Sequence, residues 1–320
     1  MWAPATLEEG SETLSFESYA EAWLDHVRAR VRPTTYRGYE GLMRVYAVPA
    51  LGNIPLGDLH PLHVQRLEGA ALQRVSAGTV LNLHLVLTQS LNQAVRWGLI
   101  ASNPAKGAQP PRPRRPEPVV VSPDLVRKIL AVTEGTSLAL PVALALATGM
   151  RRGEILGLRW SDLDDGYTHA FVRRTLQATH GGLRFHEPKT RRSRRSVALP
   201  EMIRPYLRRE RADQDVRRMR YGERWRDSGL VVCARWGAPV YPDTVSSSFR
   251  ALRRRTGLPE IRFHDLRHAH ATLMLLGGVH PKVVSERLGH ASVGITLDIY
   301  SHVLPSMQTE AVQAFDRMFP

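Results

Sequence analysis

Two side chains with complementary phosphate chemistry lie three residues apart in the segment "FHDLRHAHATLMLLGG". His264 can exchange a proton near neutral pH, whereas the guanidinium of Arg267 stays charged and offers a planar fork that suits a phosphate. On a helix, this spacing puts both residues on one face. The pair has the chemistry to hold a phosphodiester and to move a proton beside it. A capping histidine next to a surface arginine would explain the same residues without chemistry.

A third candidate, Arg151, lies in "ATGMRRGEILGLRWSDLD", where one helix ends at Thr-Gly and another begins. Arg151 shares an apolar stripe with Ile155 and Leu158, so we expect it to face a cleft and Arg152 to point more toward solvent. Glu154, one turn from Arg151, is expected to orient that arginine rather than to catalyse.

The segment "EPKTRRSRRSVALP" contains Lys189, one of only four lysines in a chain with 44 basic residues. Unlike arginine, a lysine can give up a proton, so its use on a tight hairpin suggests an acid. A solvated hairpin tip that contacts phosphates is an equally open explanation.

His290 and Tyr300 are ten residues apart in "LGHASVGITLDIYSHV". Tyrosine is a nucleophile in some covalent mechanisms. However, Ile295, Ile299 and Val303 recur at helical spacing, and Tyr300 fits the same apolar stripe. The spacing alone favours packing.

A metal site or cofactor is not expected. His264 and His268 have the four-residue spacing of metal ligands, with His270 and His290 near them, but the carboxylates or thiolates that usually complete such a site are missing. Cys233 is the only cysteine, which rules out an intramolecular disulfide.

The composition is that of a soluble, globular and strongly basic protein. The 320 residues are 43% hydrophobic and 23% charged, and the formal net charge is +14. Such an excess favours a polyanion such as nucleic acid, although genomic base bias can also enrich arginine. There is no signal peptide and no apolar run of membrane-spanning length, so we expect a cytoplasmic, DNA-associated protein.

Periodicity predicts a mainly α fold with a small antiparallel β-sheet (α+β). Helical faces recur between residues 15 and 102, beginning with Phe16, Tyr19 and Trp23. Residues 103–118 contain six prolines and are expected to form an extended linker. Alternating segments after Asp164 predict strands. A helix with the core stripe Leu266, Leu273 and Leu276 should carry His264 and Arg267. The expected organisation is an N-terminal tail (1–14), a helical domain (15–102), the linker (103–118), a second domain (119–304) and a C-terminal tail (305–320).

Together, "ATGMRRGEILGLRW", a hairpin lysine, "HDLRHAHAT" and "LGHASVGITLDIYSHV" resemble, in this order, the motifs of the tyrosine recombinases, the phage-integrase family. The resemblance covers Ser15 to about Val303 and implies a helical core-type DNA-binding domain followed by a catalytic domain. It implies a site-specific DNA recombinase that forms a 3′-phosphotyrosyl intermediate without metal or nucleotide. The implied catalytic residues are Arg151 and Arg267 as phosphate clamps, Lys189 as general acid, His264 and His290 as proton-transfer and hydrogen-bonding groups, and Tyr300 as nucleophile.

The resemblance also implies partners. These are double-stranded DNA carrying recombination sites, three further copies of the chain in a tetramer on DNA, and, as a candidate, a directionality factor. Val312, Phe315 and Phe319 share one helical face, so we expect the C-terminal tail to dock on a neighbouring protomer. Larger phage integrases often have a further N-terminal arm-binding domain, and the sequence leaves open whether one belongs here.

Two other functions remain open at this point. A type IB topoisomerase would use the same chemistry and would relax supercoils without a partner site. A DNA-binding regulator on the same scaffold would need no catalysis, although every implied catalytic position holds a competent residue type.

The role of Lys189 can be tested by substituting arginine, which keeps the charge and loses the acid. We expect Lys189→Arg to bind DNA but cleave it slowly. A substrate with a 5′-bridging phosphorothiolate, whose leaving group needs no proton, should restore cleavage. Failure of that substrate to rescue a DNA-binding variant would move the acid to another residue.

Overall fold

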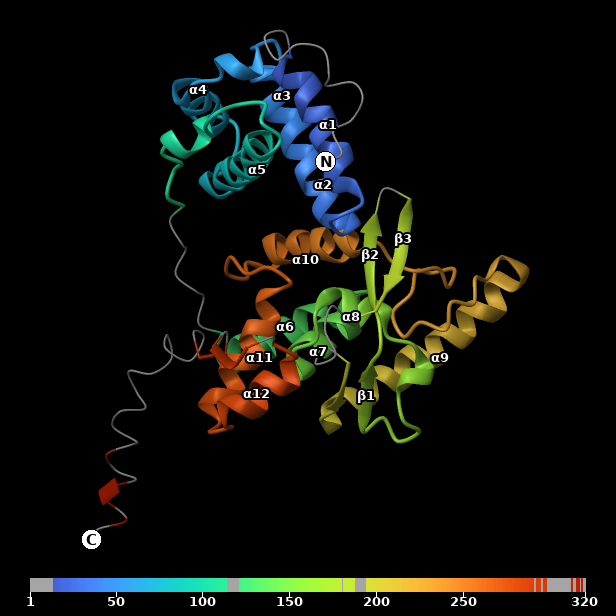
Figure 1. The fold of residues 1–320 in the computed structure, drawn as a ribbon. Coiled ribbons are helices and arrows are strands. Elements are labelled where there is room, and N and C mark those ends of the chain that lie inside the picture. The colour runs from blue at the N-terminus through green and yellow to red at the C-terminus, as the bar shows by residue number, and fades with distance from the viewer. Residues whose placement is uncertain are drawn as a thin grey trace. The chain divides into compact units, whose positions relative to one another are not determined.

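The computed structural model describes residues 14–113, 121–179, 181–187, 194–290, 292–294 and 296–297, together with residues 312, 315, 316 and 318. The chain divides into two compact units, with the boundary between residues 117 and 118 (Figure 1). Each unit has its own hydrophobic core, and each is described by itself.

In the described residues of the first unit, every named element is a helix or a helical turn. Phe16, Tyr19, Ala20 and Trp23 are almost fully buried, which confirms the predicted apolar face. Ser15 caps the first helix by accepting a hydrogen bond from the Ser18 amide. The elements are α1 (Phe16–Arg28), α2 (Pro33–Leu42), a π-helical turn (Met43–Ala47), α3 (Val48–Leu51), a 3₁₀ turn (Leu56–Asp58), α4 (Pro61–Leu72), α5 (Ala77–Arg96) and a 3₁₀ turn (Pro104–Gly107).

The expected linker is wrong at its start. Residues 103–108 belong to the helical unit, because Ala105 and Ala108 are buried in its core. Asn103 donates to the carbonyl of Thr88 and to Oδ1 of Asn92, both at 2.9 Å, and caps the following turn. A short polar segment can therefore pack by supplying hydrogen bonds, which its proline content concealed.

The second unit surrounds one apolar helix, α7, of which every residue from Leu140 to Thr148 is buried. No helix in the described part of the chain is long and apolar enough to cross a membrane. Helices α6, α8, α9 and α11 contact α7, and α12 packs on α11 and on strand β4. The helices are α6 (Pro123–Thr133), α7 (Ala139–Thr148), α8 (Arg152–Gly157), α9 (Arg204–Tyr221), α10 (Pro242–Thr256), α11 (Asp265–Leu276) and α12 (Pro281–Leu288), with 3₁₀ turns at Trp160–Asp162, Glu201–Ile203 and Gly222–Arg224.

In the described part of the chain, four short strands form two antiparallel pairs, so the predicted mainly α fold with a small antiparallel β component is confirmed. Strand β1 (His169–Val172) pairs with β4 (Arg195–Ala198), and β2 (Thr175–Thr179) pairs with β3 (Gly182–His186). The alternating run "HAFVRRTLQAT" thus divides at its two arginines between the two pairs.

Helix α11 buries two faces rather than one. Leu266 packs into the core around α7, whereas Ala271 and Leu275 pack with α12. The expected core residue Leu276 is 48% exposed. The single-stripe prediction was wrong here because the helix lies between two neighbours.

We expect Asn103→Ala to lower the free energy of unfolding of the first unit by about 1–3 kcal/mol, because it removes the side-chain hydrogen bonds of Asn103 to Thr88 and Asn92 and leaves the buried Ala105 amide without its acceptor. Asn53→Ala, at an exposed position, is the control. Thermal unfolding of the full chain would measure both, and equal transitions would contradict the packing of this segment.

Candidate active site

Arg267 is held by two backbone carbonyls inside the second unit. It lies in the first turn of α11 and is 4% exposed. Its Nη1 donates to the carbonyl of Gly149 at 2.6 Å and its Nη2 to that of Leu288 at 2.8 Å. Burial, then the charge of Arg151, lowers the pKa of Arg267 to about 9, so the guanidinium remains charged at neutral pH.

Arg151 bonds the next carbonyl along the chain from the Leu288 carbonyl that Arg267 bonds. Its Nη2 donates to the carbonyl of Gly289 at 3.1 Å, and its side chain is 39% exposed. Arg151 has an extended backbone at the N-cap of α8, outside the helix, so the helical-stripe argument does not apply to it. Arg152 is 33% exposed and bonds Ser246 on α10, so the expectation that it points more toward solvent was wrong.

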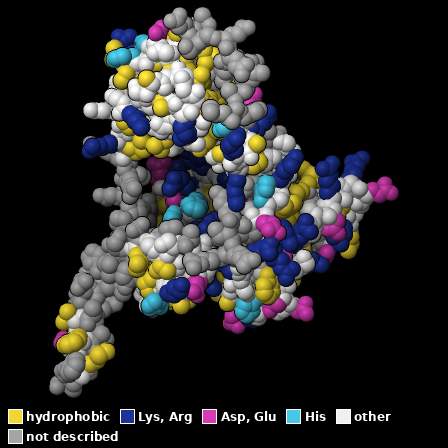
Figure 2. Space-filling view, in the orientation of Figure 1, with side chains coloured by type: hydrophobic (Ala, Val, Ile, Leu, Met, Phe, Trp, Pro, Cys, Tyr) yellow, Lys and Arg dark blue, Asp and Glu magenta, His cyan; other side chains and the backbone are white. Residues whose placement is uncertain are grey.

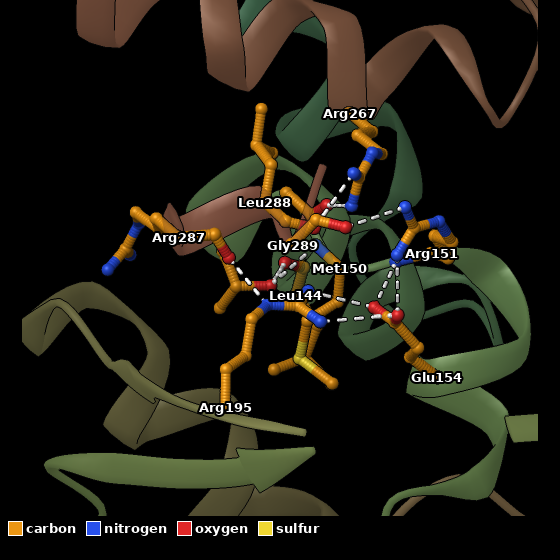
Figure 3. A network of polar contacts seen from close by, with 11 residues as sticks. Leu144, Met150, Arg151, Glu154, Arg195, Arg267, Arg287, Leu288 and Gly289 are labelled. Atoms are coloured by element: carbon orange, nitrogen blue, oxygen red, sulfur yellow. Dashed lines mark hydrogen bonds and ion pairs between the residues drawn. The ribbon is translucent and has the colours of Figure 1, made fainter. Parts of the chain in front are cut away.

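Glu154 orients Arg151, as expected. Its carboxylate is 3% exposed and accepts from the backbone amide and from Nη1 of Arg151, both at 2.9 Å (Figure 3). Burial alone would raise the pKa of Glu154, but the hydrogen bond and charge of Arg195, then the charge of Arg151, hold that pKa below its usual value. The carboxylate is therefore ionised and fixes its arginines.

His290 directly follows these carbonyls in the chain. Its Nδ1 lies 2.8 Å from the hydroxyl of Thr296, a fully buried residue. Burial, then Arg267 and Arg151, lowers the pKa of His290 to about 4, so the ring is neutral at pH 7. If the Thr296 hydroxyl donates to Nδ1, the proton is on Nε2, where the ring can donate to a ligand.

His264 occupies the N-cap position of α11, three residues before Arg267. Its ring is exposed but crowded, with the His268 ring at 5.2 Å. This partial desolvation, then His268 and Arg267, lowers the pKa of His264 to about 4. A neutral imidazole at this position can accept a proton.

Close packing beneath the two arginines depends on Gly149. It ends α7 in the left-handed region (φ +64°), where a Cβ atom would lie 2.4 Å from Leu288 and 2.7 Å from His270. The buried His270 contacts the carbonyl of Leu146 through Nδ1 and accepts from Arg287 through Nε2. Helix α12 can therefore approach the end of α7 closely.

Four of the six predicted site residues are described. Arg151, Arg267 and His290 lie together, because the two arginines bond the two carbonyls that precede His290. The fourth, His264, is close enough to Arg267 for that charge to lower its pKa. Lys189 and Tyr300 lie outside the described residues. Within the described part of the chain, no three His, Cys, Asp or Glu side chains form a group that could hold a metal ion.

One buried residue of this network, Arg195, was missed. Its Nη1 and Nη2 donate to Glu154 at 3.2 and 2.9 Å, and its side chain is 7% exposed. A signal for it was present, because Arg195 alternates with the buried Val197 and so shares its side of strand β4. Arginine side chains on strands are usually exposed, so the pattern alone did not single Arg195 out.

Comparison with models of protein families shows to which family the chain belongs. Residues 120–307 match the model of the phage integrase family, and residues 15–68 match the N-terminal SAM-like domain of phage integrases. The chain belongs to the phage integrase family. It is therefore a tyrosine-type site-specific recombinase, an enzyme that cuts and rejoins DNA.

Curated relatives agree with this membership of the phage integrase family. A tyrosine recombinase XerC-like protein of Caldanaerobacter subterraneus subsp. tengcongensis is 30% identical over 318 residues, which is 93% of this chain and 81% of the relative. An integrase of Streptomyces ambofaciens is 28% identical, over 91% of this chain and 77% of the relative.

Solved integrase structures share the fold. The Tn1549 transposon integrase in complex with a circular intermediate DNA has a TM-score of 0.77 at 20% identity, covering 93% of this chain and 99% of that one. A lambda integrase dimer bound to a COC′ core site has a TM-score of 0.69 at 19% identity, covering 89% and 95%.

The contact at Gly149 gives a stability prediction for this family member. Gly149→Ala and Gly135→Ala both place alanine at positive φ, but a Cβ atom at Gly135 meets nothing within 4 Å. We expect Gly149→Ala to lose about 1–3 kcal/mol more free energy of unfolding than Gly135→Ala, because only it overpacks the α7–α12 contact. Urea unfolding would measure both, and equal losses would argue against this contact.

Proposed function

We propose that Arg151 and Arg267 clamp the scissile phosphate of double-stranded DNA while Tyr300 attacks it, with Lys189, His264 and His290 assisting. The observation that carries the proposal is that both arginines are anchored on consecutive carbonyls, directly before His290. Each guanidinium has five N–H donors, so it keeps some for a ligand while it bonds to backbone.

In the cleavage step, the Tyr300 oxygen forms a bond to phosphorus and the bond to the 5′ oxygen breaks. His264, whose ring is neutral at pH 7, accepts the tyrosine proton. Lys189 donates a proton to the departing 5′ oxygen. Charge gathers on the non-bridging oxygens, where Arg151, Arg267 and a donating His290 stabilise it, each by roughly 3–4 kcal/mol on the scale of oxyanion-hole donors.

Rejoining reverses these steps with a 5′ hydroxyl from another strand as the nucleophile. The number of phosphoester bonds is unchanged throughout, so the phosphotyrosyl link conserves the energy of the diester. The chemistry therefore requires neither a nucleotide nor a metal ion.

Basic surface supports double-stranded DNA as the substrate. The net charge is +14, and Figure 2 shows many Lys and Arg side chains on the second unit, over the region of α9 and the strands. A polyanion releases counterions when it binds such a surface. We infer recombination sites on DNA as the partner and a DNA-associated location in the cytoplasm.

Assembly of four protomers on DNA completes the proposal. A lambda integrase tetramer bound to a Holliday junction shares the fold, with a TM-score of 0.67 at 19% identity. We infer the same assembly here, with the C-terminal tail docking on a neighbouring protomer. Most of that tail lies outside the described residues. A directionality factor is a further candidate partner.

The nucleophile can be tested with a nicked suicide substrate in buffer that contains a chelator. We expect the wild-type protein to trap a covalent protein–DNA adduct and Tyr300→Phe to form none, because the substitution removes only the attacking oxygen. Tyr241→Phe changes an exposed tyrosine elsewhere and should form the adduct at the wild-type rate.

Half-site binding by gel shift would show whether each variant still recognises DNA. An adduct formed by Tyr300→Phe would remove Tyr300 from the mechanism. Loss of the wild-type adduct on chelation would overturn the metal-free reaction.

A further inference from the structure

Three arginine side chains donate hydrogen bonds to three consecutive backbone carbonyls at the C-terminal end of α12 (Figure 3). Arg195 Nε donates to the carbonyl of Arg287 at 2.6 Å, Arg267 to that of Leu288 at 2.8 Å, and Arg151 to that of Gly289 at 3.1 Å. Terminal helix carbonyls lack partners within the helix and carry the negative end of its dipole, so cations stabilise them. The proposed mechanism uses two of these arginines and leaves Arg195 without a role.

The rest of the Arg195 guanidinium faces Glu154. Its Nη1 and Nη2 bond the two carboxylate oxygens at 3.2 and 2.9 Å, and the same carboxylate holds the amide and Nη1 of Arg151. One planar group thus joins the end of α12 to the residue that orients Arg151. The side chain of Arg195 is 7% exposed, whereas that of Arg151 is 39% exposed. Arg195 is therefore buried, and Arg151 is accessible to a ligand.

The turn before His290 also packs directly on Arg195. Gly289 has φ +66°, and a Cβ atom there would lie 3.0 Å from Nη1 and 3.3 Å from Cζ of Arg195. The Arg195 guanidinium therefore bonds Glu154, which orients Arg151, and also packs on the turn that leads to His290.

We propose that Arg195 is a positioning residue for DNA strand cleavage, which fixes the Arg151 guanidinium relative to the turn that carries His290. This inference rests on the proposed function of Arg151 and His290. Lysine cannot replace Arg195, because one ammonium group cannot span Glu154 and the Arg287 carbonyl in the fixed geometry of a guanidinium. A small displacement of a clamp is enough to slow a reaction by about 100-fold.

The first experiment compares Arg195→Lys with Arg194→Lys in the full chain. Arg194 is the adjacent residue, 57% exposed and paired with Glu187, and serves as the matched control. We expect Arg195→Lys to slow single-turnover adduct formation on the suicide substrate by about 10- to 100-fold. Half-site affinity should stay within about threefold of wild type, because Arg195 is shielded from DNA. Arg194→Lys should change neither quantity.

A double-mutant cycle separates positioning from a general structural role. If Arg195 acts through Arg151, adding Arg195→Lys to Arg151→Lys should slow cleavage by less than about threefold more. Multiplicative effects of the two substitutions, a wild-type cleavage rate for Arg195→Lys, or a parallel loss of DNA affinity would each overturn the inference.

A second variant covers the case in which Arg195→Lys does not fold. Gly289→Ala pushes on the Arg195 guanidinium from the turn, while Gly257→Ala also has positive φ but a Cβ atom there meets nothing within 4 Å. We expect slow cleavage and normal DNA affinity only for Gly289→Ala. Equal cleavage rates for the two variants would contradict the proposal.

Hydrogen exchange without DNA distinguishes failure of this inference from failure of the proposed function. The amides of Gly289 and His290 bond the carbonyls of Glu286 and Ser285, both at 3.0 Å. They should exchange faster in Arg195→Lys than in wild type or Arg194→Lys. A wild-type protein that forms no adduct would refute the proposed function, whereas unchanged exchange in Arg195→Lys would refute the link made by Arg195.

Discussion

The C-terminal end of α12 is the constraint on which the site depends. The carbonyls of Arg287, Leu288 and Gly289 at this end need donors from outside the helix, and Arg195, Arg267 and Arg151 supply them in that order. Bringing three guanidinium groups together is unfavourable, and burial adds to the cost. The buried carboxylate of Glu154 offsets part of this repulsion, because it accepts from Arg151 and Arg195. The site is thereby left with an excess of positive charge around an open arginine.

Burial is the main cause of the low pKa values of the two histidines. Burial, then His268 and Arg267 for His264, and burial, then Arg267 and Arg151 for His290, lower each pKa to about 4, so both rings are neutral at pH 7. A neutral histidine can accept a proton or donate one hydrogen bond without adding to the charge. The division of roles follows, with arginines providing charge and histidines providing proton transfer and hydrogen bonds. A phosphodiester is the kind of ligand that would complete such a site.

The sequence predicted much of this site because its residues occur in short motifs with local geometry. Arg267 follows His264 by one helical turn, and Glu154 lies one turn from Arg151, so their relations could be read from spacing. The helical units and strands were also predictable from periodicity. Arg195 was missed because its partners, Glu154 and Arg287, are 41 and 92 residues away along the chain. The packing of Ala105 and the exposure of Leu276 likewise depend on neighbours that periodicity does not reveal.

The most direct test is a crystal structure of the Tyr300→Phe protein bound to a DNA half-site with an intact scissile phosphate. The account predicts that Arg151 and Arg267 donate to the non-bridging oxygens of that phosphate while they keep their bonds to the carbonyls of Gly289 and Leu288. His290 should donate to the same phosphate through Nε2. A complex in which the phosphate contacts neither arginine, or in which both arginines leave the end of α12 to reach it, would contradict the account.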